Sequence, residues 1–101
     1  MATYIALLKF TTEGRQGIGD TSGLDAAKGV AEAMGVQWKG WYMTFGQYDA
    51  VAVVEAPDDE TVAKLALAQA TSGGIVSETM RAFTEDEFRG LVAALPQAGQ
   101  A

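Results

Sequence analysis

Short stretches rich in β-branched, aromatic and aliphatic residues recur along the chain between polar and glycine-rich segments, and they predict four β-strands. These stretches are residues 3–10, 36–45, 50–56 and 75–83. Only Gly46-Gln47-Tyr48-Asp49 separates the second stretch from the third. Because so short a connection joins neighbouring antiparallel strands, these two stretches are expected to form a hairpin.

Apolar residues at helical spacing predict two helices between the strands. The first is expected over residues 24–34, with Gly35 placed as its C-terminal cap. The second follows Pro57-Asp58-Asp59-Glu60, whose acidic residues suit a helix N-terminus, and it stops at Ser72-Gly73-Gly74. The segment 11–23, which holds four glycines among polar residues, is expected to be a loop.

A further helix is expected after the fourth strand. Thr84-Glu85-Asp86-Glu87 fits a capping box, in which the side chains of Thr84 and Glu87 each accept a hydrogen bond from the other residue's backbone. One apolar stripe follows and ends at Pro96; it is formed by Phe88, Leu91, Val92 and Leu95. The chain is thus expected to form one α+β domain over residues 1–95, with residues 96–101 as a flexible tail.

The element order β-α-β-β-α-β admits few topologies when crossover connections are right-handed. The favoured one is ferredoxin-like, with an antiparallel sheet in the strand order 4-1-3-2 and both intervening helices on one face. The other face of such a sheet ordinarily meets water and is polar. Here both faces of the central strands are largely apolar, so we expect the second face to be covered by the sheet of another subunit, as in a dimeric α/β barrel.

The alternation of side chains indicates which face meets the partner. One phase of the central strands combines charged and apolar residues: Ile5, Leu7, Lys9, Val51, Val53 and Glu55. The opposite phase carries small alanines and branched residues suited to packing under helices. The charged phase is therefore assigned to the contact between subunits. Strand pairing in this order brings Lys9 near Asp49, so the two side chains can form an ion pair there or remain a solvated pair at the rim of the sheet.

Composition narrows the classes of function. Asp and Glu outnumber Lys and Arg by 13 to 7, giving a formal charge of −6, and an acidic chain repels nucleic acids and anionic membranes. There is no cysteine and no histidine, which excludes thiolate nucleophiles, Cys/His zinc sites and histidine acid–base chemistry. We expect no metal, no cofactor, no nucleic-acid partner and no membrane partner. Since the first ten residues do not fit a signal peptide, a cytoplasmic location is expected.

Three segments together resemble the GYD-domain family, named for a Gly-x-Tyr-Asp motif after the second strand. The motif is Gly46-Gln47-Tyr48-Asp49, and the other segments are residues 3–14 and 53–60. The resemblance spans roughly residues 3–88. It implies a ferredoxin-like subunit of the dimeric α/β-barrel group, and it implies no reaction. Relatives often carry Arg or Lys near the start of the first helix, where this chain has Thr21-Ser22-Gly23-Leu24-Asp25; Lys28 is a poor substitute.

Three groups of residues are candidate sites, each with a structural alternative. Tyr48 and Asp49 can serve the turn itself, with Gly46 at positive φ, or can act as a phenol donor and a carboxylate base. Trp38, Trp41 and Tyr42 can form an interface or core, or can stack on a planar ligand. Arg81 can bind a substrate carboxylate, or can pair with Glu55 or Glu78 across strands.

The leading hypothesis is a homo-oligomeric module that binds a small molecule or a partner in or beside the cavity between two sheets. The ligand-binding residues expected are Trp41, Tyr42, Tyr48, Lys9 and Arg81. The alternative is a cofactor-independent enzyme, such as a small oxygenase or isomerase, with Tyr48 and Asp49 as its catalytic acid–base pair; this alternative depends on analogy between folds. A third hypothesis is an effector domain that acts with a separate partner protein.

Overall fold

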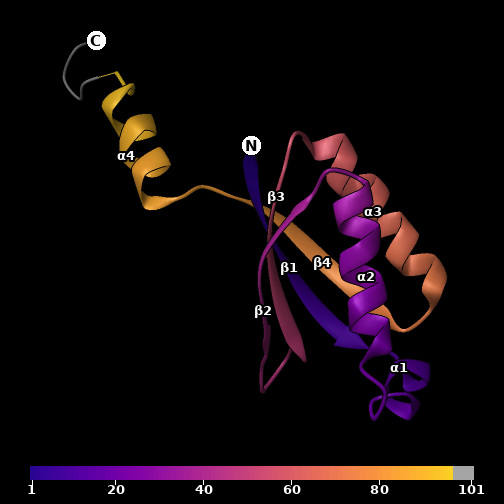
Figure 1. Ribbon diagram of the computed structural model, residues 1–101. Coiled ribbons are helices and arrows are strands. Elements are labelled where there is room, and N and C mark those ends of the chain that lie inside the picture. The colour runs from indigo at the N-terminus through magenta and orange to yellow at the C-terminus, as the bar shows by residue number, and fades with distance from the viewer. Residues whose placement is uncertain (97–101) are drawn as a thin grey trace.

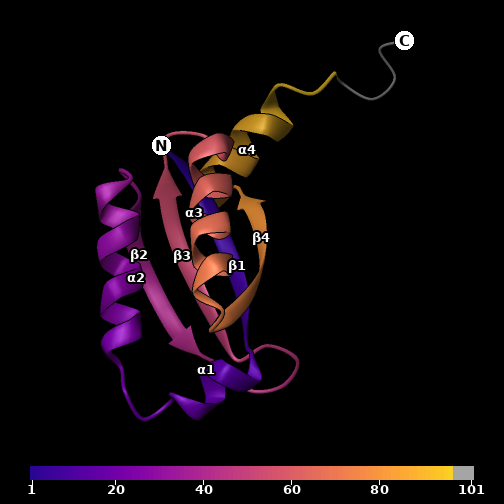
Figure 2. The ribbon, with the colours of Figure 1, turned by 90° about the vertical axis from the view of Figure 1, so that its right-hand side faces the viewer.

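A computed structural model, which describes residues 1–96, contains one antiparallel sheet with helices on one face (Figure 1). Its strands in spatial order are β2 (Gln37–Met43), β3 (Ala50–Ala56), β1 (Ala2–Phe10) and β4 (Ile75–Ala82). The helices α2 (Ser22–Ala33) and α3 (Asp59–Ser72) lie side by side over this sheet (Figure 2). The ferredoxin-like strand order expected from the sequence is therefore confirmed.

The core lies between the helices and the phase of the sheet that carries Tyr4 and Leu8. Tyr4 pairs with Val54 and Leu8 with Ala50 across β1 and β3, and all four side chains are buried. The buried residues of the helices that complete this core are Ala31, Val62 and Leu65. The helices thus cover the phase of alanines and branched residues. The opposite phase, which includes Lys9 and Glu55, is left on the open face, as the alternation predicted.

Side-chain caps mark where α3 and the C-terminal helix begin. Asp58 Oδ1 accepts a hydrogen bond from the Thr61 backbone N–H at 2.8 Å, and this N-cap starts α3. The helix ends at Gly73, whose φ of 80° lies in the left-handed region that glycine tolerates. The capping box of Thr84 and Glu87 is present at the start of α4 (Glu85–Ala93).

The helix α4 lies apart from the rest of the domain, beyond the end of the sheet (Figure 1). Its apolar stripe faces solvent, with Phe88, Leu91 and Val92 about half exposed or more. None of the residues of α4, all within the described part of the chain, is buried. Residues 97–101, most of the expected tail, lie outside the described residues.

A bulge in β2 brings its two tryptophans to the same face. Trp38 is paired with Val54 and Trp41 with Ala52, and the register shifts between Trp38 and Gly40. One extra residue in a strand reverses the alternation beyond it. Both indoles therefore point toward the helices. Tyr42, which follows Trp41 directly, lies on the open face, so Trp41 and Tyr42 do not form one ligand wall as the sequence suggested.

The segment expected to be a loop contains a short helix, α1 (Thr12–Gln16). Thr11 caps it by accepting a hydrogen bond from the Gly14 backbone N–H at 3.0 Å. The Thr11 backbone N–H donates to the Gly74 carbonyl at 3.1 Å, and its hydroxyl donates to the Gly73 carbonyl at 2.7 Å. These bonds hold α1 against the turn between α3 and β4. The glycines of this segment led to the prediction of a loop. A Thr cap and little more than one helical turn were enough to form this short helix.

Candidate functional site

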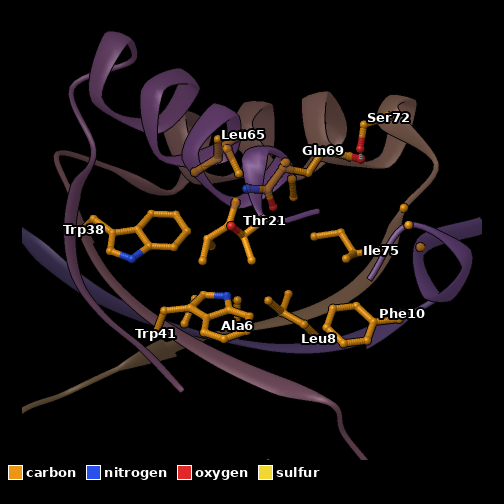
Figure 3. A pocket seen from close by; sticks show the side chains of 18 of the residues that line it. Ala6, Leu8, Phe10, Thr21, Trp38, Trp41, Leu65, Gln69, Ser72 and Ile75 are labelled. Atoms are coloured by element: carbon orange, nitrogen blue, oxygen red, sulfur yellow. Dashed lines mark hydrogen bonds between the residues drawn. The ribbon is translucent and has the colours of Figure 1, made fainter. Parts of the chain in front are cut away.

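A cavity of about 430 Å³ lies between the helices and the sheet of the single chain (Figure 3). Its floor is formed by small and branched side chains of the central strands, namely Ala6, Leu8, Ala52 and Val54. Its roof is formed by apolar side chains of α2 and α3, namely Leu24, Ala27, Val62, Leu65 and Ala66. The sequence placed a ligand between two sheets, whereas this cavity lies on the other side of the sheet, under the helices.

Three aromatic residues form walls of the cavity. Trp38 and Trp41 lie at one end and Phe10 lies toward the other, with Ile75 beside it (Figure 3). The Nε1–H of Trp38 is buried and has no hydrogen-bond partner among the described residues. Buried donors are nearly always paired, so this indole lies in an environment that is unusually apolar for it. The walls offer flat aromatic surface rather than charge.

Polar groups of the cavity gather near its mouth. The Gln69 carboxamide extends from α3 into the space in Figure 3. Within residues 1–96 this carboxamide makes no hydrogen bond to another residue. The charged lining residues are Glu13 and Asp20, both acidic. The Ser22 backbone N–H donates to Asp20 Oδ1 at 2.9 Å, and this bond lowers the pKa of the Asp20 carboxyl.

The turn after β2 has the geometry expected of its sequence. Gly46 has a φ of 94°, and the Thr44 hydroxyl donates to the Tyr48 carbonyl at 2.7 Å. Asp49 Oδ2 accepts the Phe10 backbone N–H at 2.8 Å, and the Asp49 backbone N–H donates to the Leu8 carbonyl at the same distance. This Gly-x-Tyr-Asp segment thus ties the hairpin to the end of β1.

A family model of the GYD domain matches residues 4–92 of the 101 residues. The chain belongs to the GYD-domain family. No curated protein matches it. None of the described helices of this GYD domain is long and apolar enough to cross a membrane. Nor does any group of three or more Asp and Glu residues in the described part of the chain come together as a metal site would require.

Asp49 of the GYD motif makes two hydrogen bonds with the backbone of β1, and the possible ion pair with Lys9 does not form. No contact within 4.0 Å joins the charged groups of Lys9 and Asp49 among the described residues. The two residues are neighbours, as the strand pairing predicted, but the Asp49 carboxylate turns to the Phe10 N–H. A backbone donor held in place by β1 needs no ordering of a long lysine side chain, which explains the preference.

Lys9 instead joins Tyr48 and Glu78 on the open face. The Tyr48 hydroxyl donates a hydrogen bond to Glu78 Oε2, and Lys9 Nζ lies 5.6 Å from the centroid of the Tyr48 ring. The bond to the Glu78 carboxylate raises the pKa of Tyr48, because ionisation of the phenol would remove the donor. This cluster brings together a cation, a phenol and a carboxylate from β1, the GYD turn and β4.

The expected grouping of Glu55, Glu78 and Arg81 does not form. Glu55 pairs with Lys39 on the open face, with 3.0 Å between Nζ and Oε2. Arg81 pairs in register with Tyr4 and so lies on the helix side of the sheet. Its guanidinium donates to the carbonyls of Thr3 and Ala82 and lies 4.3 Å from the centroid of the Phe83 ring. Strand alternation separates Arg81 from both glutamates.

Sequence reasoning missed Gln69, whose carboxamide points into the cavity and makes no hydrogen bond among the described residues. A signal for it was present, because Val62, Leu65 and Gln69 follow the spacing of one helix face. A polar residue on a stripe that is otherwise buried is out of place in a core and fits a cavity. Of the expected ligand-binding residues, Trp41 lines the cavity, whereas Tyr42, Tyr48 and Lys9 lie on the open face.

Proposed function

We propose that this GYD domain is a homo-oligomeric module that binds a small molecule in the cavity between α2, α3 and the sheet. The observation that carries this proposal is the cavity itself, of about 430 Å³, with walls of Trp38, Trp41 and Phe10. Ligand sites in proteins are concave, largely apolar and typically about 300–1,000 Å³ in volume. The cavity has that size and that lining.

Packing energetics support a ligand for this space. Protein interiors are close-packed and rarely leave voids larger than a water molecule. The side chains around this cavity belong to the main core, since Val54, Val62 and Leu65 contribute to both. This space is partly open to solvent, so a bound molecule would replace water against its apolar lining and add dispersion contacts there. A domain of this length has a small core, and an unfilled space within it lowers the stability that the core can supply. The presence of this space therefore favours a function for it.

The open sheet face supports the oligomeric part of the proposal. Ile5, Leu7, Val51 and Val53 are only partly covered there, and Tyr42, Val76 and Met80 of the flanking strands are largely exposed. No element of the described chain packs over this face (Figure 1). Contiguous apolar surface of this kind is typical of contacts between proteins. The partner we propose is a second copy, whose identical face would meet this one.

The cluster of Lys9, Tyr48 and Glu78 favours a second candidate function, a cofactor-independent enzyme that transfers protons. Such an enzyme would act on a molecule held between two open faces, with the Glu78 carboxylate as base and the Tyr48 hydroxyl as acid. A ligand that co-purifies and is incubated in deuterated water would then incorporate deuterium in the presence of the wild-type protein. Loss of this exchange in Glu78→Gln would support the enzyme, and no exchange with the wild type would exclude it.

The test of the binding function is native mass spectrometry of the protein isolated gently from its source. We expect an oligomer in which each chain carries the same additional mass. Ala52→Leu, which extends a side chain from the floor into the cavity, should lose that mass. The matched control is Ala68→Leu, because Ala68 is exposed on α3 and does not line the cavity.

Fluorescence gives an independent readout, because Trp38 and Trp41 are the two tryptophans of the sequence and both line the cavity. Removal of the bound molecule should therefore change the tryptophan emission of the wild type and leave that of Ala52→Leu unchanged. A wild-type protein that is isolated bare, and whose emission responds to no small molecule, would contradict the proposal.

A further inference from the structure

We infer that the cavity selects an uncharged aromatic molecule with a carbonyl group, whose oxygen accepts a hydrogen bond from the Gln69 carboxamide. This inference rests on the proposed binding function and specifies its ligand. Three observations lead to it: the charges around the cavity, the free hydrogen-bonding capacity of Gln69, and the flat walls.

The charges around the cavity oppose an anionic ligand. Among the described residues that line it, Glu13 and Asp20 are charged and none is Lys or Arg. Lys28 lies near the site, with Nζ 5.9 Å from the centroid of the Trp38 ring, but does not line the cavity. A buried carboxylate or phosphate without a cation to pair with is strongly disfavoured.

A helix start beside the cavity already carries a negative charge. The N-terminus of α2 lies at the mouth of the cavity, where Thr21 and Leu24 line it. Backbone N–H groups at a helix start favour negative charge. The Asp20 carboxylate accepts the Ser22 N–H at 2.9 Å and so supplies that charge from the chain itself. An incoming anion would meet the negative charge of Asp20 at this helix start.

Gln69 supplies the polar recognition. Its carboxamide enters the space from α3 (Figure 3) and has no hydrogen-bond partner within the described chain. A carboxamide offers two N–H donors and one carbonyl acceptor without charge. The Gln69 side chain is only partly buried, so a ligand oxygen that accepts from its amide takes the place of water and adds specificity. A ketone or amide oxygen on the ligand meets that requirement.

The shape of the cavity favours a planar aromatic body. The indole rings of Trp38 and Trp41 and the ring of Phe10 form its walls, and small alanines such as Ala6 and Ala52 form the floor between them. Aromatic rings pair with one another in offset or edge-to-face arrangements. A fused aromatic ring system fits between these walls while its substituent reaches the carboxamide of Gln69.

Three probes with the same naphthalene body test this inference: acetylnaphthalene, ethylnaphthalene and naphthoate. Acetylnaphthalene offers a neutral hydrogen-bond acceptor, ethylnaphthalene offers none, and naphthoate offers an anionic one. Titration calorimetry of the full chain gives their affinities for the wild type, for Gln69→Met and for the control Gln47→Met, since Gln47 lies exposed on the hairpin turn. Gln69→Leu is a second variant in case Gln69→Met perturbs the helix.

We expect naphthoate to bind at least about tenfold more weakly than acetylnaphthalene. The ratio of the affinities for acetylnaphthalene and ethylnaphthalene should fall about fivefold in Gln69→Met, as expected for one lost hydrogen bond, and should not change in Gln47→Met. In nitrogen-15 spectra the side-chain amide signal of Gln69 should shift with acetylnaphthalene and not with ethylnaphthalene.

The outcomes separate this inference from the proposed function. If all three probes bind equally, or if the ratio is unchanged in both Gln69 variants, the inferred ligand class is wrong while binding in the cavity stands. If none of the probes binds and the native protein carries no ligand, the proposed function fails together with the inference.

Discussion

Gly14 and Gly74 lie so close together that a β-carbon on Gly14 would be 2.1 Å from the Gly74 carbonyl oxygen. The same carbonyl accepts the Thr11 backbone N–H at 3.1 Å. Two backbone segments that are sixty residues apart in the sequence are therefore joined without a side chain between them. Both glycines line the cavity, so this contact fixes one side of its mouth.

Gly14→Ala should therefore destabilise the protein although alanine favours helices. The new methyl group would meet backbone atoms that cannot rotate away, and overpacking of this kind costs about 1–3 kcal/mol. Urea unfolding followed by circular dichroism measures the change in the free energy of unfolding. Gly19→Ala is the matched control, because no atom lies within 4 Å of a β-carbon there. Equal stability of the two variants would show that the Gly14–Gly74 contact is dispensable.

Enlarging two alanines of β3 should affect stability differently. Ala52 lines the cavity, so Ala52→Leu has room and should leave the free energy of unfolding unchanged or raise it. Ala56 is fully buried and does not line the cavity, so Ala56→Leu should cost about 1–3 kcal/mol. Thermal and urea unfolding of the ligand-free proteins compare them. A similar loss in both variants would mean that the space under α2 and α3 is not open.

The Asp58 cap predicts a loss of stability in acid. Its carboxylate accepts the backbone N–H and then the hydroxyl of Thr61, and these bonds lower the pKa of Asp58 below the ordinary 3.8. A lowered pKa in the folded state adds stability above pH 3.8, and this is lost as the pH falls through the lower value. Asp58→Asn keeps an acceptor and cannot titrate.

The melting temperature of Asp58→Asn should therefore lie slightly below that of the wild type at neutral pH. The difference should shrink or reverse as the pH falls below 3.8 and through the lowered pKa of Asp58, where the folded wild type becomes protonated. Thermal melts across this range measure both proteins side by side. Two curves that remain parallel down to the lowest pH would argue against the cap as the source of acid sensitivity.

The Tyr48–Glu78 bond predicts the opposite behaviour in alkali. The pKa of the Tyr48 phenol is raised above 10.0, mainly by its hydrogen bond to the Glu78 carboxylate. The bond therefore contributes stability below pH 10, and this stability is lost as the pH rises through the raised pKa. Near-ultraviolet titration of tyrosinate should show a late component that Tyr48→Phe removes and Glu78→Gln moves to lower pH. Tyr4, whose pKa is also raised, by its bond to Asp59, should keep its own late component in both variants.

The open face predicts how the oligomer can be broken. Val53 lies at the centre of this face, paired with Ile5 of β1 and Gly40 of β2. Val53→Lys would bury a charge between two sheets, so the subunit dissociation constant should rise at least about tenfold. Sedimentation velocity at several concentrations measures it, with Leu67→Lys as control because Leu67 is 68% exposed on α3. A wild type that sediments as a monomer would refute the sheet-to-sheet pairing.

Local patterns were sufficient for the elements and their order. The period of the apolar residues predicted every strand and the three longer helices, and Asp58 and the Thr84–Glu87 box marked two helix starts correctly. Alternation along β1 and β3 also identified the face that the helices cover. These features depend on residues close in sequence, together with the few topologies that right-handed crossovers allow.

The candidate site was decided by contacts between distant residues. The bulge near Lys39 brought Trp38 and Trp41 to one face, and the approach of Gly14 to Gly74 positioned α1 at the cavity mouth. Neither follows from local propensity, because a bulge and a backbone contact are specified by the partner segment. The sequence by itself determined which residues are apolar, which strands pair and that charge on the cavity side is scarce. Only the tertiary structure decided that the cavity lies under the helices, since a cavity depends on how side chains that are distant in the sequence pack against one another.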